Sequence, residues 1–170
     1  MSRLSFVLRW WPIFALIASA AMLAIAHAFE SFGGLAPCHL CLKQREAYWA
    51  ACAVAAVGVA LAFTPWEARG RRIVSALLAL VFLYGAGYAI YHAGAEWKFW
   101  PGPQSCSGAA TAVSAADLAA VLKGARSSAP PACDQAAWVF LGLSMAGWNA
   151  LVSLGLAAVS SVAALRRAAA

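Results

Sequence analysis

The chain has 170 residues, 64% of them apolar, and its 12 basic residues exceed its 6 acidic residues to give a net charge of +6. Soluble domains are only about 45–50% apolar, and a soluble fold of this length has too little interior to hide so much apolar surface. Disordered chains are poor in apolar residues, and the basic residues here form no stripe of the kind that binds nucleic acid. The composition therefore excludes these classes and indicates a single integral membrane domain, residues 1–170.

Four uncharged runs are long enough to cross a bilayer, for which a helix needs about 20 apolar residues. The runs are rich in Ala and Leu and lack the alternation of strands, so helices are expected. Tryptophans lie near the ends of the runs, as they do at membrane interfaces. The predicted fold class is all-α, a four-helix transmembrane bundle, with spans at about residues 10–29, 47–66, 73–95 and 139–162.

The first run also resembles a cleavable signal peptide. Arg3 and Arg9 precede it, and Ala26, His27 and Ala28 match an A-x-A cleavage site. The run is longer than the apolar core of about 7–15 residues that a signal peptide has. We therefore expect it to be retained as a helix.

The distribution of charge orients the four spans. The side that holds both termini and residues 66–72 carries seven basic residues against one acidic residue, while the other side carries five of each. Basic residues favour the cytoplasmic side, so both termini are expected there, with outward-facing loops at about residues 30–46 and 96–138. The second loop is long and rich in Pro, Gly and Ser, and residues 114–123 within it are expected to form a short amphipathic helix on the membrane surface.

Four of the five cysteines lie in these outer loops, at positions 38, 41, 106 and 133. Disulfides persist outside the cytoplasm, so two are expected, and three interpretations stay open: structural staples, a zinc site and a redox-active pair. Zinc sites commonly use two short Cys-x-x-Cys units, and only Cys38 and Cys41 have this spacing. A Cys-x-x-Cys disulfide closes too small a ring to be a good staple. The spacing therefore favours a redox-active pair, and no metal is expected.

The position of the first pair adds to this interpretation. Cys38 and Cys41 directly precede the second span, where the helix dipole favours a thiolate. Arg45 lies one turn after Cys41 and has two possible roles. Its guanidinium could lie beside the Cys41 sulfur or beside an electron acceptor, or it could anchor the helix at the membrane interface. Cys52 lies within the span and is expected to pack as a small apolar residue. The small residues of segment 142–147 are expected to pack closely between helices.

Three blocks of the chain resemble the disulfide bond formation protein B (DsbB) family. The run from Cys38 to Arg45 resembles the family signature Cys-x-x-Cys-x-x-[Glu/Gln]-Arg. Residues 91–97 and then Cys106 resemble the end of its third span and its first loop cysteine. Cys133 and residues 138–145 resemble its second loop cysteine and the start of its fourth span. The blocks occur in the family's order and cover nearly the whole chain.

The resemblance implies a thiol:quinone oxidoreductase of the bacterial inner membrane. Such an enzyme reoxidises a DsbA-like periplasmic oxidase of thioredoxin fold and passes the electrons to membrane quinone, either ubiquinone or menaquinone. By this resemblance, Cys106 and Cys133 would form the loop disulfide that the partner attacks at Cys106. Cys133 would then attack Cys38, and Cys41, left as the thiolate, would reduce the quinone.

The resemblance also implies a set of quinone-binding residues. Arg45 would stabilise charge at the quinone, and Gln44, His92 and Met145 would occupy neighbouring positions. Position 44 is Gln where some family members have Glu, so no acid is expected there.

Three other functions compete with this one. A DsbI-like paralogue would share both cysteine pairs and serve a dedicated partner. A protein of the vitamin K epoxide reductase type would carry its Cys-x-x-Cys after the loop pair, whereas this chain carries it first. A non-catalytic membrane scaffold would use its disulfides only as staples.

Overall fold

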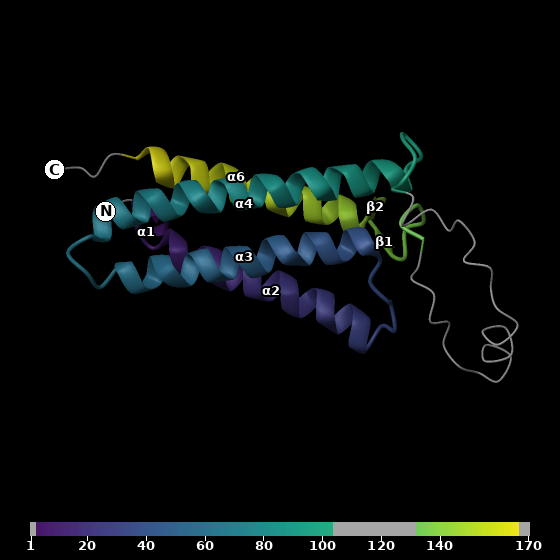
Figure 1. The fold of residues 1–170 in the computed structure, drawn as a ribbon, viewed down its shortest axis with the longest axis horizontal. Coiled ribbons are helices and arrows are strands. Elements are labelled where there is room, and N and C mark those ends of the chain that lie inside the picture. Colours follow the sequence, from purple (N-terminus) through teal and green to yellow (C-terminus); the bar gives the residue numbers. More distant parts are fainter. Residues whose placement is uncertain (1–2, 104–131, 167–170) are drawn as a thin grey trace, which may run out of the picture.

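The computed structural model describes residues 3–103 and 132–166 (Figure 1). The amphipathic helix expected at residues 114–123 lies outside them. In chain order the described elements are α1 (Arg3–Arg9), α2 (Trp11–Ser31), α3 (His39–Leu61), α4 (Glu67–Glu96), β1 (Val139–Phe140), β2 (Leu143–Ser144) and α6 (Met145–Leu165).

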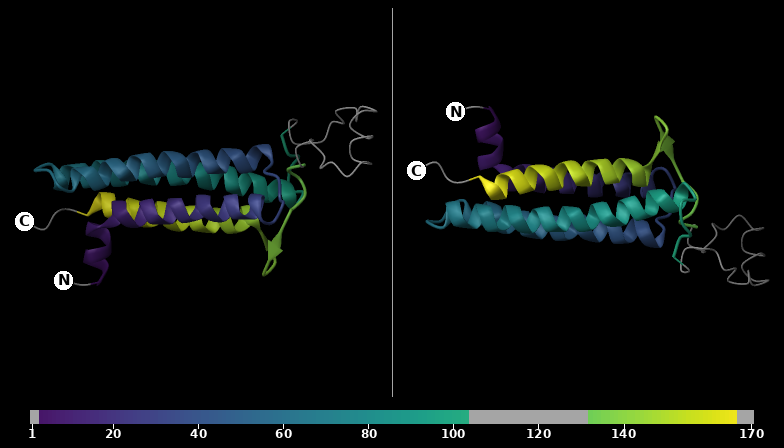
Figure 2. Two further views of the ribbon diagram at one scale, coloured as in Figure 1. Left: turned by 90° about the horizontal axis from the view of Figure 1, so that it is seen from below. Right: turned by 90° about the horizontal axis from the view of Figure 1, so that it is seen from above.

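Helices α2, α3, α4 and α6 lie side by side and form an up-and-down bundle (Figure 1). Helix α3 packs between α2 and α4, and α4 packs most extensively against α6. Helix α1 turns away from the bundle axis at one end, and the hairpin of β1 and β2 projects from the opposite end (Figure 2). Short connections between α2, α3 and α4 keep these neighbours antiparallel.

Small residues line much of the bundle interior beside a few large ones such as Phe82, while many large apolar side chains point outward. Ala51 and Ala89 are fully buried, whereas Ile17 is 60% exposed and Leu80 is 64% exposed. This arrangement is unfavourable in water, where exposed apolar surface is costly. In a bilayer, large side chains face lipid, and small residues let helix backbones approach one another. The packing is therefore that of a membrane protein.

Three of the described helices are long and apolar enough to cross a membrane, namely α2, α4 and α6. Helix α3 is just as long, with 23 residues. Its first turns, however, carry the charges of Lys43, Arg45 and Glu46, which lower its mean hydropathy. Helix α3 is thus polar where it begins and apolar where it ends.

The second expected span differs from α3 at both ends. The helix begins at His39, well before residue 47, and it ends at Leu61, before residue 66. The charged residues that precede residue 47 are helical because they find partners there. Lys43 lies 2.9 Å from Glu46 within α3, and Arg45 lies 2.6 Å from Glu30 of α2.

The fourth helix begins later than residue 139, because residues 139–144 form a hairpin. Leu141 and Gly142 both have positive φ, at 51° and 80°, as in the two-residue turn that matches the twist of paired strands. Gly142 therefore serves a turn and not helix packing, whereas Gly147 in the same segment is buried in α6. Ser144 caps α6 by accepting the N–H of Gly147 at 3.1 Å.

The close contact at Gly58 gives a test of the packing. A Cβ at this position of α3 would lie 2.7 Å from Val74 of α4 and 2.9 Å from Pro12 of α2. We expect Gly58→Ala to destabilise the bundle by about 1–3 kcal/mol, the usual range for overpacking, measured as thermal unfolding in detergent. Gly87→Ala is the matched control, since nothing lies within 4 Å of its Cβ position. Equal unfolding midpoints for the two variants would contradict the close packing.

Candidate redox site at the start of helix α3

Two thiols lie at the first turn of α3. Cys38 is the N-cap residue, and its Sγ accepts the backbone N–H of Cys41 at 3.2 Å. The two sulfurs are 2.8 Å apart, and both cysteines are free thiols. A sulfur at a helix N-terminus faces the positive end of the helix dipole, which stabilises a thiolate. The local geometry therefore activates Cys38.

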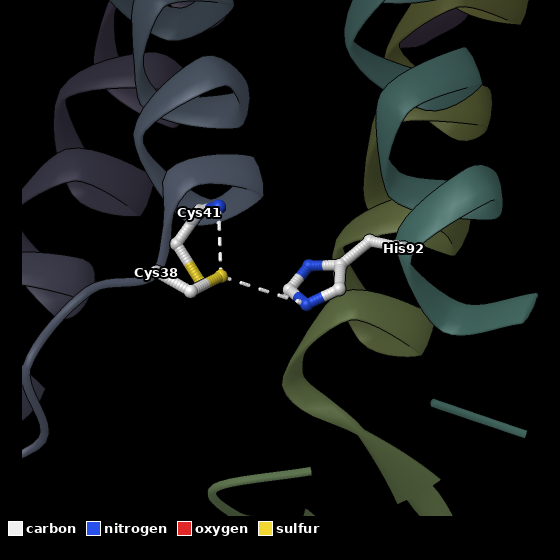
Figure 3. A group of neighbouring side chains, drawn as sticks. All are labelled: Cys38, Cys41 and His92. Atoms are coloured by element: carbon white, nitrogen blue, oxygen red, sulfur yellow. Dashed lines mark hydrogen bonds between the residues drawn. The ribbon is translucent and has the colours of Figure 1, made fainter. Parts of the chain in front are cut away.

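Helix α4 brings His92 to this pair from a position far along the chain (Figure 3). Its Nε2 lies 3.7 Å from the Sγ of Cys38. The hydrogen bond from the Cys41 thiol, and after it the contact with His92, lower the pKa of Cys38 from its ordinary value to about 4. In the fully reduced pair the thiolate is therefore favoured at Cys38. The Cys41 thiolate that the resemblance implies belongs to a different state, in which Cys38 is bonded to Cys133.

A row of buried side chains determines which nitrogen of His92 carries the proton. Tyr48 donates to Asn149 Oδ1, Asn149 Nδ2 donates to Gln44 Oε1, and Gln44 Nε2 lies 2.9 Å from His92 Nδ1. The amide nitrogen of Gln44 has only hydrogens to offer, so Nδ1 must accept. The ring proton is therefore on Nε2, the atom that faces Cys38.

A cavity of about 380 Å³ opens beside the pair. Its volume lies within the range of roughly 300–1,000 Å³ that small-molecule sites occupy. Most of its lining is apolar, and the ring centroid of Phe29 in α2 lies 5.2 Å from that of Trp138 on one wall. Every predicted site residue that the structure describes, apart from Cys133, lines this cavity: Cys38, Cys41, Gln44, Arg45, His92 and Met145.

Arg45 lies one turn after Cys41 and points toward α2. Its guanidinium lies 2.6 Å from the carboxylate of Glu30 and donates to the carbonyl of Ala26 at 3.1 Å. The side chain is only 14% exposed and lines the cavity. A guanidinium has further N–H donors beyond these two contacts, and they give the cavity a cationic end.

The second cysteine pair is described only in part. Cys133 is fully buried and disulfide-bonded, and it packs in a small cluster with Cys38 and Leu40. Lys98, just after α4, holds this segment through an ion pair of 2.6 Å with Asp134. The structure therefore places Cys133 against the first pair, while Cys106 lies outside the described residues.

Comparison with known proteins agrees with this geometry. The chain matches the family described as "Disulfide bond formation protein DsbB" over residues 8–163. The chain belongs to the DsbB family. Two curated relatives carry the name "Disulfide bond formation protein B". The one from Methylococcus capsulatus is 35% identical over 83% of this chain and 84% of its own length. The one from Stutzerimonas stutzeri is 32% identical over 91% of this chain and 93% of its own length. No solved structure matches the chain significantly.

DsbB proteins are thiol:quinone oxidoreductases, and the sulfur geometry suits thiol chemistry better than zinc binding. The ligand atoms of Cys38, Cys41 and His92 lie within 4.8 Å of one another. Two thiolates on tetrahedral zinc, each about 2.3 Å from the metal, stand roughly 3.8 Å apart. The two sulfurs stand 2.8 Å apart, closer than in a zinc site, and this spacing suits a pair that closes to a disulfide.

Sequence reasoning did not assign a role to several residues of this DsbB site. Asn149 and Tyr48 orient Gln44, Glu30 pairs with Arg45, and Glu96 contacts His92 at 3.6 Å. One signal was available, because Asn149 is a polar residue within an apolar run and both glutamates stand at the ends of such runs. Their partners could not be identified without the helix packing.

The low pKa of Cys38 gives a direct test of the site. In the reduced protein we expect thiolate absorbance near 240 nm to persist at neutral pH and to be lost as pH falls through about 4. Cys41→Ala removes the strongest hydrogen bond to this sulfur, so the midpoint should move up toward the ordinary thiol value. Cys52→Ala, which removes a thiol outside the site, is the control. A midpoint near 9 in the wild type would contradict the assignment.

Proposed function

We propose that this chain reoxidises a periplasmic DsbA-like protein of thioredoxin fold and passes the electrons to membrane quinone. This is the reaction of the DsbB family. The observation that supports it most strongly is the cavity that has a thiol pair and a cation at one end and apolar walls elsewhere. Electron transfer from a soluble dithiol to an apolar acceptor needs a site that both molecules can reach, with a thiol pair at one end and apolar walls for the acceptor.

In this proposal all four long helices cross the bacterial inner membrane. Helix α1 and the end of α6 lie at one end of the bundle, and the start of α3 lies at the other (Figure 1). The excess of basic residues at the end with α1 favours the cytoplasm for that end. The thiol pair and the hairpin are then periplasmic, as contact with a periplasmic partner requires.

The cavity fits a quinone head group. A quinone is flat and apolar, with a carbonyl acceptor at each edge, and it supplies an acceptor for two electrons when bound. The N–H groups of Arg45 that Glu30 and Ala26 do not take are donors suited to one of those carbonyls, and His92 lines the same cavity. Gln44 positions the ring of His92, and Met145 contributes apolar wall. Both ubiquinone and menaquinone have such a head group.

Electrons would reach the cavity through two disulfide exchanges. The partner thiolate attacks Cys106 of a Cys106–Cys133 disulfide, and the released Cys133 attacks Cys38. Each exchange replaces one sulfur by another through a mixed disulfide. The packing of Cys133 against Cys38 supports the second exchange. Cys41 is then the sulfur that is left facing the cavity.

The low pKa of Cys38 favours electron flow in this direction. A thiol whose pKa is depressed in the folded protein stabilises the reduced pair at every pH above that pKa. Stabilising the reduced form makes the corresponding disulfide a stronger oxidant. The Cys38–Cys41 disulfide is therefore suited to accept electrons that originate from a strongly oxidising partner.

The function is tested by quinone reduction with purified protein and a reduced DsbA-type partner as the donor. We expect turnover in the wild type and its complete loss in Cys41→Ser. Cys52→Ser should retain it, because Cys52 packs against the core away from the cavity. No turnover in the wild type, with both disulfides unreactive toward the partner, would refute the proposal.

The role of Arg45 is tested separately. Loss of a charged hydrogen bond worth about 1.5–3 kcal/mol corresponds to about tenfold or more in affinity. We therefore expect Arg45→Ala to raise the KM for quinone by about that factor and to leave the KM for the partner within about twofold. Lys43→Ala, on the exposed side of the same helix, is the control. An unchanged quinone KM in Arg45→Ala would rule out this role.

A further inference from the structure

Glu96, the last residue of α4, is a buried carboxylate that the exchange steps above do not use. Its side chain is 5% exposed and lines the cavity. Its Oε1 lies 3.6 Å from His92 Nε2, and its Oε2 is buried with no hydrogen-bond partner among the described residues. A buried carboxylate oxygen without a partner is costly while the group is charged. This oxygen is therefore a site where a hydrogen can be bound.

Glu96 and Cys38 both face the same ring nitrogen of His92, Nε2. Its Nδ1 accepts from Gln44, so the Nε2–H is the single hydrogen that it offers, and both Glu96 and Cys38 face it. A second ring proton on Nδ1 would point at the Gln44 amide hydrogens, which Asn149 holds in place. His92 therefore offers a single hydrogen-bond donor to the two groups. Two anions on one N–H in apolar surroundings also disfavour each other.

The other titratable groups of the cavity have partners of their own. Apart from Glu96, the titratable groups that line the cavity among the described residues are Cys38, Cys41, Arg45, Tyr48 and His92. The two cysteines share a hydrogen bond between their sulfurs. Arg45 is paired with Glu30 of α2, and the hydroxyl of Tyr48 bonds to Asn149 of α6. Outside the cavity lining, Lys98 and Asp134 neutralise each other. Glu96 is thus the carboxyl group of the cavity that is available to take up a proton.

We propose that Glu96 stores one of the two protons that quinone reduction consumes, an inference that rests on the proposed function. Two electrons and two protons arrive when a dithiol reduces the Cys38–Cys41 disulfide. One proton stays between the two sulfurs, and the other converts the Glu96 carboxylate to the acid. When the S–S bond forms again, the two electrons pass to quinone together with the proton of the sulfur pair and the proton of Glu96, which gives the quinol. Glu96 is then a carboxylate again.

This cycle keeps the charge of the site constant. The oxidised site carries the charge of the Glu96 carboxylate, and the reduced site carries the charge of the Cys38 thiolate. A second negative charge never forms in the apolar cavity, where it would be costly. No proton has to cross from water to the quinone during the reaction.

The proton count of the reduction step tests this without quinone. The oxidised protein is reduced by excess dithiothreitol at about pH 7.5, and released protons are counted with an indicator dye. We expect the wild type to retain both protons and Glu96→Gln to release about one more per molecule, because Cys38 stays a thiolate. The loop cysteines contribute equally in both proteins. Glu46→Gln, on the exposed face of α3, should behave as the wild type, and Glu96→Asp should restore retention.

Release of about one proton by the wild type would overturn the proposal, and so would full retention by Glu96→Gln. Where Glu96→Gln does not fold, the wild-type count is combined with the thiolate absorbance of Cys38, because retention of both protons beside a Cys38 thiolate requires a second proton site. The proton count is made without quinone, so it is independent of the test of the proposed function. A wild type that retains both protons but fails to reduce quinone would refute only the proposed function.

The pH profile separates proton storage from a structural role. We expect Glu96→Gln to slow quinone reduction at least about tenfold at pH 8, within the usual effect of losing an acid–base group. Its rate should recover as pH falls, because water then supplies the proton, whereas disulfide exchange with the partner stays within about twofold. An equal loss at every pH and in both reactions would mean that Glu96 only supports the fold, and would overturn the proposal.

Discussion

Polar side chains inside an apolar bundle must form their hydrogen bonds with one another, and this requirement fixes how the side chains of the site are arranged. Tyr48 and Gln44 of α3, Asn149 of α6 and His92 of α4 form one hydrogen-bonded row across three helices. Without water, each of these groups would lose a hydrogen bond if any helix rotated or slid. The row therefore sets the register of the three helices, and it also directs the single ring hydrogen of His92 at Cys38.

The division of α3 into a polar start and an apolar end places the chemistry at a boundary. The cysteines stand at the helix N-terminus, and most of the side chains that line the cavity behind them are apolar. The ion pair of Arg45 with Glu30 lets a guanidinium stay at this depth. A charge held by a partner is much less costly than an isolated one. The same pair leaves other N–H groups of Arg45 for a ligand.

The site has few groups that can stabilise a negative charge, and this determines where such a charge can lie. One N–H of His92 faces both the Cys38 sulfur and the Glu96 carboxylate. The helix N-terminus and the Cys41 thiol favour the anion at Cys38 in the reduced protein. A second anion nearby would have little to stabilise it. Proton position and redox state are coupled for this reason, and the coupling needs no movement of the backbone.

Run length and short spacings are local properties of the chain, so the helical class, the four apolar runs and the Cys-x-x-Cys at a helix start could all be predicted from the sequence. It also pointed to the residues around the cavity through a family resemblance. The pairs of side chains that meet are known only from the packed helices: Cys38 with His92, Arg45 with Glu30, and Gln44 with Asn149. These contacts depend on how each helix is rotated about its axis, which a uniformly apolar run does not specify. The hairpin at residues 139–144 could not be predicted from the sequence pattern either, because an apolar run gives no sign of a turn with positive φ at Leu141.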